Sequence, residues 1–128
     1  MRALVVDDAK TVRMFHRGIL EAAGFVVEEA MNGVEGLERA LAAQARPDLL
    51  LVDVNMARMD GYAFLNAVRA EPALADIPAI MISTERERQD ADRAFAAGAN
   101  LYLIKPVKPD DLSRFALILA DTGDETAA

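Results

Sequence analysis

The stretch DLLLVDVNMARMDG (residues 48–61) joins an apolar run to an acidic turn. Residues 49–52 are all apolar, the run ends at Asp53, and polar residues and turn formers follow as far as Gly61. Consecutive apolar residues before a turn are typical of a strand that is buried on both faces of a sheet. The stretch therefore predicts a buried strand that holds Asp53 at the edge of the sheet.

The rest of the chain alternates between short apolar runs and helical periodicity. We expect strands at residues 2–6, 25–30, 48–52, 79–83 and 101–104, and helices at 11–24, from residue 32 through 43, and at 62–70, 85–98 and 109–120. Strands that are apolar on both faces and alternate with helices predict an α/β fold, a doubly wound parallel sheet of five strands with five helices. Residues 1–121 are expected to form one domain, and residues 122–128 a flexible C-terminal tail.

Local patterns predict how two of the helices begin and which face of the first helix is buried. Asn32 with Glu35, and Thr84 with Glu87, have the spacing of a capping box. His16, in the middle of the first helix, is expected to be a partly exposed surface residue. The apolar face of that helix is expected to contain five residues, Val12, Phe15, Ile19, Leu20 and Ala23.

The composition excludes several classes of protein. The 128 residues include no cysteine and one histidine, which rules out disulfides, thiol catalysis and a metal site built from thiolates or several histidines. Any bound metal must therefore be a hard ion that prefers oxygen. The net charge of −7 disfavours nucleic-acid binding. No apolar run is long enough to span a membrane, and no leader precedes the first strand, so a cytoplasmic location is expected.

Polar side chains follow four of the five predicted strands. Right-handed crossovers place the carboxyl ends of parallel strands at one edge of the sheet, where such folds carry their sites. The residues expected at this edge are Asp7, Asp8, Asp53, Ser83, Thr84 and Lys105. Close carboxylates repel one another unless a cation compensates them, and Mg²⁺ is the ion that suits oxygen ligands and water.

This combination of groups predicts a chemistry. With Mg²⁺ bound, the charge of an incoming phosphoryl group is neutralised, and a carboxylate can act as the nucleophile. Lys105 offers a point charge to a phosphoryl oxygen, and the hydroxyl of Ser83 offers a hydrogen bond. The sequence therefore predicts a site that forms an aspartyl phosphate.

Four segments resemble the motifs of response-regulator receiver domains: LVVDD (4–8), LLLVDVNMARMDG (49–61), IMIST (80–84) and LYLIKP (101–106). The segments follow one another in the order and spacing of that family, so the resemblance covers nearly the whole chain. Within the family, the chain most resembles the stand-alone chemotaxis regulators of the CheY type. The resemblance implies a flavodoxin-like sheet with strand order 2-1-3-4-5. It also implies Mg²⁺ as the cofactor.

The resemblance implies a role for each residue that matches a family motif. Asp53 matches the phosphoacceptor and Lys105 the invariant lysine, so that Asp53, Lys105 and Ser83 form the catalytic set. The metal ligands would be Asp53, Asp8, Asp7 through water, and the backbone carbonyl of Asn55. Ser83 and Tyr102 match the switch pair, although an aromatic residue in a strand can also be ordinary core. The Lys105–Pro106 bond is a candidate for a cis peptide.

Other positions bear on the lifetime of the phosphoryl group. Asn55 and Glu85 match the two positions that tune its hydrolysis in the family, and Thr84 stands where a smaller residue is common, which could narrow access to the site. Ala57 replaces a common proline, so the loop after Asp53 could be less rigid, and Val107 replaces a frequent phenylalanine.

The resemblance implies a single-domain regulator that takes a phosphoryl group from a CheA-type histidine kinase and then binds the flagellar motor switch as a monomer. Because nothing follows the fifth helix, output through protein contacts is expected, without nucleic acid or membrane. The charges of residues 85–93 could form a solvated helix face or select the partner. A phosphate sink or relay intermediate is the alternative function.

Two further hypotheses come from other protein classes. A small phosphatase of the haloacid-dehalogenase type also uses an aspartyl nucleophile, but such an enzyme would need a second acid two residues after it, where Asn55 stands. A flavodoxin-type flavin carrier is excluded, because residues 7–11 (DDAKT) contain no hydroxyl- and glycine-rich phosphate loop.

Overall fold

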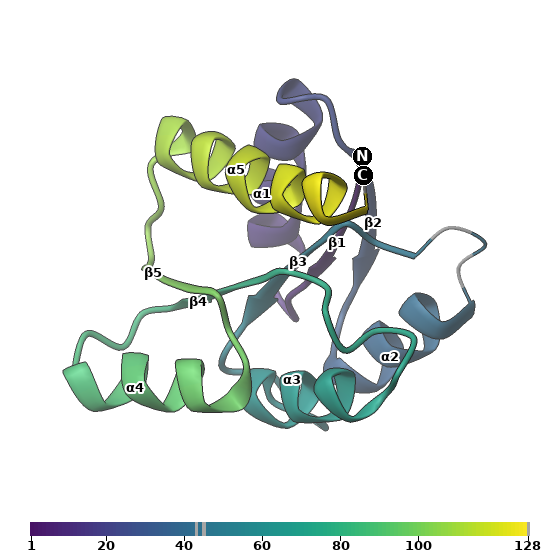
Figure 1. Cartoon of the computed structure of the whole chain (residues 1–128). Helices are drawn as coiled ribbons and strands as arrows, with labels where there is room; N and C mark the ends of the chain where they lie inside the picture. The colour runs from purple at the N-terminus through teal and green to yellow at the C-terminus, as the bar shows by residue number, and fades with distance from the viewer. Residues whose placement is uncertain (43, 45, 128) are drawn as a thin grey trace.

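The computed structural model describes residues 1–42, 44 and 46–127, with side chains described as far as Asp121. Within these residues, five parallel strands form one sheet (Figure 1). They are β1 (Arg2–Val6), β2 (Val26–Ala30), β3 (Leu49–Asp53), β4 (Ala79–Ser83) and β5 (Leu101–Ile104). Their order across the sheet is β2-β1-β3-β4-β5. The predicted fold class and strand order are therefore confirmed.

Five helices cover the two faces of this sheet in the described part of the chain. α1 (Lys10–Ala22) and α5 (Pro109–Ala127) pack on one face, and α2 (Gly33–Ala42), α3 (Gly61–Ala70) and α4 (Arg88–Ala97) pack on the other (Figure 1). A search of the described helices found none with the length and apolar character needed to cross a bilayer. α5 continues past the expected helix end at residue 120. The flexibility of residues 122–128 stays a prediction, and residue 128 lies outside the described residues.

The sheet separates two hydrophobic cores. Leu50 and Val52 of β3 belong to the core beneath α2, α3 and α4, whereas Leu49 and Leu51 belong to the core beneath α1 and α5. Successive side chains of a strand point to opposite faces, so a strand between two cores must be apolar at every position. This requirement explains the apolar run that precedes Asp53.

Side-chain caps set the start of two helices. Asp60 Oδ1 accepts the backbone N–H of Ala63 at 2.8 Å and caps α3. Asn32 Oδ1 accepts the backbone N–H of Glu35 at 2.9 Å, which confirms the Asn32 half of the predicted capping box of α2, whereas the Glu35 carboxylate accepts Arg39 Nε at 3.2 Å. Because a cap satisfies a backbone donor that has no partner within the helix, it fixes the residue at which the helix begins.

The predicted capping box of Thr84 and Glu87 is wrong. α4 begins at Arg88, and the N–H of Glu87 donates to Asp90 Oδ2 at 3.2 Å. The backbone of Glu85 is engaged elsewhere: its N–H donates to Ser83 Oγ at 3.0 Å, and its carbonyl accepts the hydroxyl of Tyr102 at 2.8 Å. These two bonds hold the chain after β4 as a loop, so the helix starts one turn later than predicted.

Candidate functional site

Three aspartates meet at the carboxyl edge of the sheet. Asp7 and Asp8 follow β1, Asp53 ends β3, and one carboxylate oxygen of each lies within 4.8 Å of the other two. Asp7 and Asp53 are buried, with 2% and 6% of their surface exposed, whereas Asp8 is exposed. Since β1 and β3 are neighbours in the sheet, the two strands deliver these side chains to one point, as expected.

The electrostatics of this cluster suit a divalent cation. Burial raises the pKa of the Asp53 carboxyl, a hydrogen bond from Lys105 opposes that rise, and the negative charges of Asp7 and Asp8 add to it. Carboxylate oxygens are the ligands that Mg²⁺ prefers, and a bound cation would compensate the repulsion among the three acids. The three aspartates therefore fit a Mg²⁺ site.

Lys105 links two of these acids from the end of β5. Its Nζ lies 3.0 Å from Asp53 Oδ1 and 3.3 Å from Asp7 Oδ2, and its backbone N–H donates to the carbonyl of Ser83 at 2.8 Å. Burial acts to lower the pKa of Lys105, but the hydrogen bond and charge of Asp53, together with Asp7, outweigh burial and raise it. Lys105 is therefore held as a cation beside Asp53. The Lys105–Pro106 peptide bond is cis, as predicted.

The two expected switch residues contact the same backbone segment. Ser83 is fully buried, and its Oγ accepts the N–H of Glu85 at 3.0 Å. Tyr102 is partly buried against the core beneath α2, α3 and α4, and its hydroxyl donates to the carbonyl of Glu85 at 2.8 Å. Both interpretations of Tyr102, as core and as switch, are compatible with this position. The exposed side chains of Thr84 and Glu85 lie directly after Ser83.

The loop after Asp53 closes tightly on the backbone of β3. The N–H of Gly61 donates to the carbonyl of Val54 at 2.9 Å, and a Cβ at Gly61 would collide with the carbonyl oxygen of Asp53. Asn55 is exposed within this loop. Two residues before Gly61, the carbonyl of Met59 accepts the N–H of Gly33 at 3.3 Å. These contacts attach the loop to α2 and α3. The lower rigidity that we expect from Ala57, which replaces a common proline, stays a prediction.

A cavity of about 320 Å³ adjoins the site. It is lined by Val12, Phe15, His16, Thr84, Lys105, Pro106 and Val107. His16 is buried, with 3% exposed, whereas Phe15 is 49% exposed. The predictions that His16 is a surface residue and that Phe15 is on the buried face are therefore wrong. Burial lowers the pKa of His16, the charge of Asp7 opposes that shift, and Lys105 adds to it.

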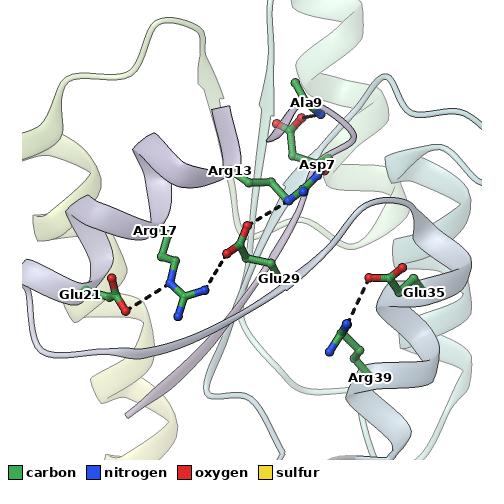
Figure 2. A network of polar contacts seen from close by, with 8 residues as sticks. All are labelled: Asp7, Ala9, Arg13, Arg17, Glu21, Glu29, Glu35 and Arg39. Carbon is green, nitrogen blue, oxygen red and sulfur yellow. Dashed lines mark hydrogen bonds and ion pairs between the residues drawn. The ribbon is translucent and has the colours of Figure 1, made fainter. Parts of the chain in front are cut away.

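Arg13 is a neighbour of the site that the sequence did not suggest. Its Nη1 donates to the backbone carbonyl of Asp7 at 2.8 Å, and its Nε donates to Glu29 Oε1 at 3.0 Å (Figure 2). An arginine one turn into a helix is common on protein surfaces. The position of Glu29 on β2 follows only from the pairing of β1 with β2, so no local pattern could have identified the contact.

Comparisons with known proteins agree with the fold and identify the family. Residues 3–116 match the family model described as response regulator receiver domain. Chemotaxis protein CheY1 of Helicobacter pylori is 38% identical over 125 residues, which is 97% of this chain and 100% of that protein. Sensor histidine kinase CheAY of the same species is 34% identical over 110 residues, 86% of this chain and 14% of that protein. The structure of Vibrio cholerae CheY4 matches with a TM-score of 0.85 and 34% identity over 92% of this chain and 97% of that chain.

Proposed function

The chain belongs to the family of response regulator receiver domains, and from that membership we propose that it accepts a phosphoryl group on Asp53 from a CheA-type histidine kinase. The observation that carries the proposal is the contact of Lys105 Nζ with Asp53 Oδ1 at 3.0 Å, beside the carboxylates of Asp7 and Asp8. A nucleophile, a cationic partner and a cation-binding pair of acids are the parts that phosphoryl transfer to a carboxylate requires.

The transfer is a displacement at phosphorus. A carboxylate oxygen of Asp53 attacks the phosphoryl group of a phosphohistidine, the P–N bond breaks, and the imidazole nitrogen keeps the electron pair. Lys105 stabilises a phosphoryl oxygen by its charge. Asp8, Asp53 and the backbone carbonyl of Asn55, with Asp7 acting through water, would hold Mg²⁺, and the charge of the ion would neutralise that of the phosphoryl group. The product is an acyl phosphate on Asp53.

Receiver domains are phosphoacceptor signalling modules and not classical enzymes. In this proposal the chain catalyses only its own phosphorylation and the hydrolysis of its own acyl phosphate. Asn55, Thr84 and Glu85 set the lifetime of the phosphoryl group, since all three are exposed directly after the strands that end in Asp53 and Ser83. Thr84 lines the cavity beside Lys105, which supports a role in access to the site.

The proposed output is phosphorylation-dependent binding of another protein by a monomer, in the cytoplasm and without nucleic acid or membrane. The similarity to a chemotaxis protein along its full length supports the flagellar motor switch as that partner. The surface made by α4, β5 and α5 carries the contact, because Tyr102 lies in β5 and its hydrogen bond reaches the loop that leads into α4.

A phosphate sink or relay intermediate is the second candidate. The match of this chain to a segment of a sensor histidine kinase favours it, because a receiver domain within a kinase has a phosphodonor in the same chain. The two candidates differ in output alone. In the first, the phosphorylated form binds a motor switch protein; in the second, it passes or loses the phosphoryl group without such binding.

Phosphorylation of the purified chain by labelled acetyl phosphate and by a phosphorylated CheA-type kinase tests the site. Wild type should be labelled in the presence of Mg²⁺, and labelling should stop when the metal is chelated. Asp53→Asn should abolish labelling, whereas the control Asp92→Asn, at an exposed position of α4, should be labelled like wild type. Equal labelling of Asp53→Asn and wild type would show that the phosphoacceptor lies elsewhere.

A further inference from the structure

The turn between β1 and α1 carries two of the three clustered aspartates. Arg13, which is not one of the cluster, is hydrogen-bonded to the backbone of this turn. Asp7 and Asp8 belong to this turn, and α1 begins after Ala9, which provides no side-chain cap. We propose that Arg13 is a positioning residue of the metal site, which holds the turn in ligand geometry before the ion binds. This inference rests on the proposed function, because it assumes that the aspartates bind Mg²⁺.

The contacts of Arg13 reach in two directions. Nη1 donates to the carbonyl of Asp7 at 2.8 Å, and Nε donates to Glu29 Oε1 at 3.0 Å (Figure 2). The Arg13 side chain is only 12% exposed. Because the guanidinium group is planar and its donors are fixed relative to one another, the bond to Glu29 also sets the direction in which Nη1 points. Arg13 thus connects the turn to the neighbouring strand β2.

Glu29 is itself held in place. Its Oε2 accepts Arg17 Nη1 at 2.6 Å, so that two arginines from successive turns of α1 share one carboxylate (Figure 2). The hydrogen bond from Arg17 lowers the pKa of Glu29, burial opposes that shift, and the hydrogen bond from Arg13 adds to it. Glu29 is therefore an ionised acceptor that orients Arg13.

The turn needs this support because its acids repel one another. Three carboxylates with oxygens within 4.8 Å tend to move apart in the absence of a cation. The carboxylate of Asp7 is fixed at Oδ1 by the N–H of Ala9, 2.9 Å away, and at Oδ2 by Lys105. Arg13 holds the backbone carbonyl of Asp7. Because Asp8 follows in the chain, this contact also fixes where the backbone of Asp8 lies.

Two effects of Arg13 on Mg²⁺ binding have opposite signs. Arg13 is a cation near a cation site, so its charge alone weakens Mg²⁺ binding, and removal of the charge should tighten it. If Arg13 positions the ligands, its removal should instead weaken Mg²⁺ binding. The direction of the change in affinity therefore separates positioning from simple electrostatics.

Mg²⁺ titration of the full chain by calorimetry tests the proposal, since the chain has no tryptophan to report binding. Arg13→Met keeps the apolar stem and should raise the Kd for Mg²⁺ about tenfold, the scale of changes behind a metal ligand. Arg39→Met is the matched control: it also removes an arginine that pairs with a glutamate, Glu35 at 3.2 Å on α2, but this pair is outside the contacts of the turn, so its Kd should stay within about twofold of wild type.

The possible results separate the two proposals. If Arg13→Met binds Mg²⁺ as tightly as wild type, or more tightly, the positioning role is wrong and the proposed function stands. If wild type binds no Mg²⁺, both are wrong. Should Arg13→Met fail to fold, Arg13→Lys decides, because it keeps the charge and loses the planar group. Weakened Mg²⁺ binding by Arg13→Lys supports positioning, and wild-type binding contradicts it.

Discussion

Ser83 and Tyr102 hold the two backbone groups of a single residue between them. Ser83 Oγ accepts the N–H of Glu85 at 3.0 Å, and the Tyr102 hydroxyl donates to the carbonyl of Glu85 at 2.8 Å. The buried hydroxyl is thereby connected to a partly exposed ring through one peptide segment. A change in the hydrogen bonding of Ser83 must alter the backbone of Glu85. Glu85 therefore connects the site with Tyr102 of β5 by a short path.

The first prediction concerns Ser83→Ala. Phosphorylation of Asp53 adds a group with about −1.5 to −2 charges, and Ser83 is expected to turn toward it and release the N–H of Glu85. Tyr102 should then change its environment. With the phosphoryl mimic beryllofluoride and Mg²⁺, wild type should show amide NMR shift changes at Glu85 and Tyr102, and Ser83→Ala should show a much smaller change at Tyr102.

Tyr102→Phe is the matching variant on the other side of Glu85. It keeps the ring and removes the hydrogen bond to the carbonyl of Glu85, so the shift change at Glu85 should persist. If Ser83→Ala left the beryllofluoride response of Tyr102 unchanged, the connection through Glu85 would not carry the switch.

The second prediction concerns the close approach behind Asp53. Gly61→Ala would place a Cβ against the carbonyl oxygen of Asp53 and 2.7 Å from Met81 Cε. The backbone would have to move, which should lower the free energy of unfolding by about 2 kcal/mol and slow phosphorylation. Gly18→Ala is the control, because nothing lies within 4 Å of its Cβ. At this helical position alanine should raise the free energy of unfolding by about 0.5–1 kcal/mol. Urea unfolding of both variants checks the signs, and equal effects would contradict the steric argument.

The sequence predicted those features that depend on strand periodicity. Strands between two cores are apolar at nearly every position, so β1 and β4 have the predicted bounds, as does the edge strand β5. Parallel strands end at one edge, so Asp7, Asp8, Asp53 and Lys105 could be brought together from their positions alone. The start of α4 was missed because the hydroxyl of Tyr102, 17 residues away, engages the backbone of Glu85.

His16 was missed for a different reason. It lies four residues from both Val12 and Leu20 and so shares their helical face, and this spacing was the available signal. Its polar ring suggested the surface, whereas in the structure His16 is buried and lines a cavity together with residues 105–107 after β5. Arg13 depends on Glu29 in another element, so only the tertiary structure could identify it.

The third prediction concerns Arg69, which connects α3 with the end of α4. Its guanidinium donates to the carbonyl of Gly98 at 2.7 and 3.1 Å, of Ala75 at 3.0 Å and of Ile77 at 2.7 Å. Arg69→Met would leave these carbonyls without a charged donor and should lower the free energy of unfolding by about 2–3 kcal/mol. Hydrogen exchange should become faster at the C-terminal end of α4.

Arg46→Met is the control for Arg69. Arg46 pairs with Asp76, but their side chains are 47% and 80% exposed, and an exposed ion pair contributes about 0–1 kcal/mol. Urea unfolding of the two variants should therefore give clearly different losses. A loss for Arg69→Met as small as that for Arg46→Met would mean that water replaces the Arg69 contacts at little cost.

The last prediction concerns the stability of the metal-free protein as a function of pH. Burial raises the pKa of Asp53, the hydrogen bond from Lys105 opposes that rise, and the charge of Asp7 adds to it. A carboxyl whose pKa is higher in the folded than in the unfolded state stabilises the fold below its unfolded pKa, and this contribution is lost as the pH rises through the folded pKa. Wild type should therefore lose stability over that interval.

Asp53→Asn has an uncharged side chain at every pH, so it should be more stable than wild type at pH 7.5, by about 1 kcal/mol. As the pH falls toward the usual range of an aspartate, the difference between the two proteins should shrink, because Asp53 becomes protonated in the folded protein and a protonated carboxyl resembles the amide of asparagine. Mg²⁺ should stabilise wild type more than the variant, since the variant lacks one of the carboxylates that repel one another. Urea unfolding between pH 4 and pH 8, with and without Mg²⁺, measures each of these differences. If Asp53→Asn were less stable than wild type at pH 7.5 without metal, the ion pair with Lys105 would stabilise the fold by more than the burial of the Asp53 carboxylate destabilises it. In that case, a metal ion would not be needed to compensate the buried charge.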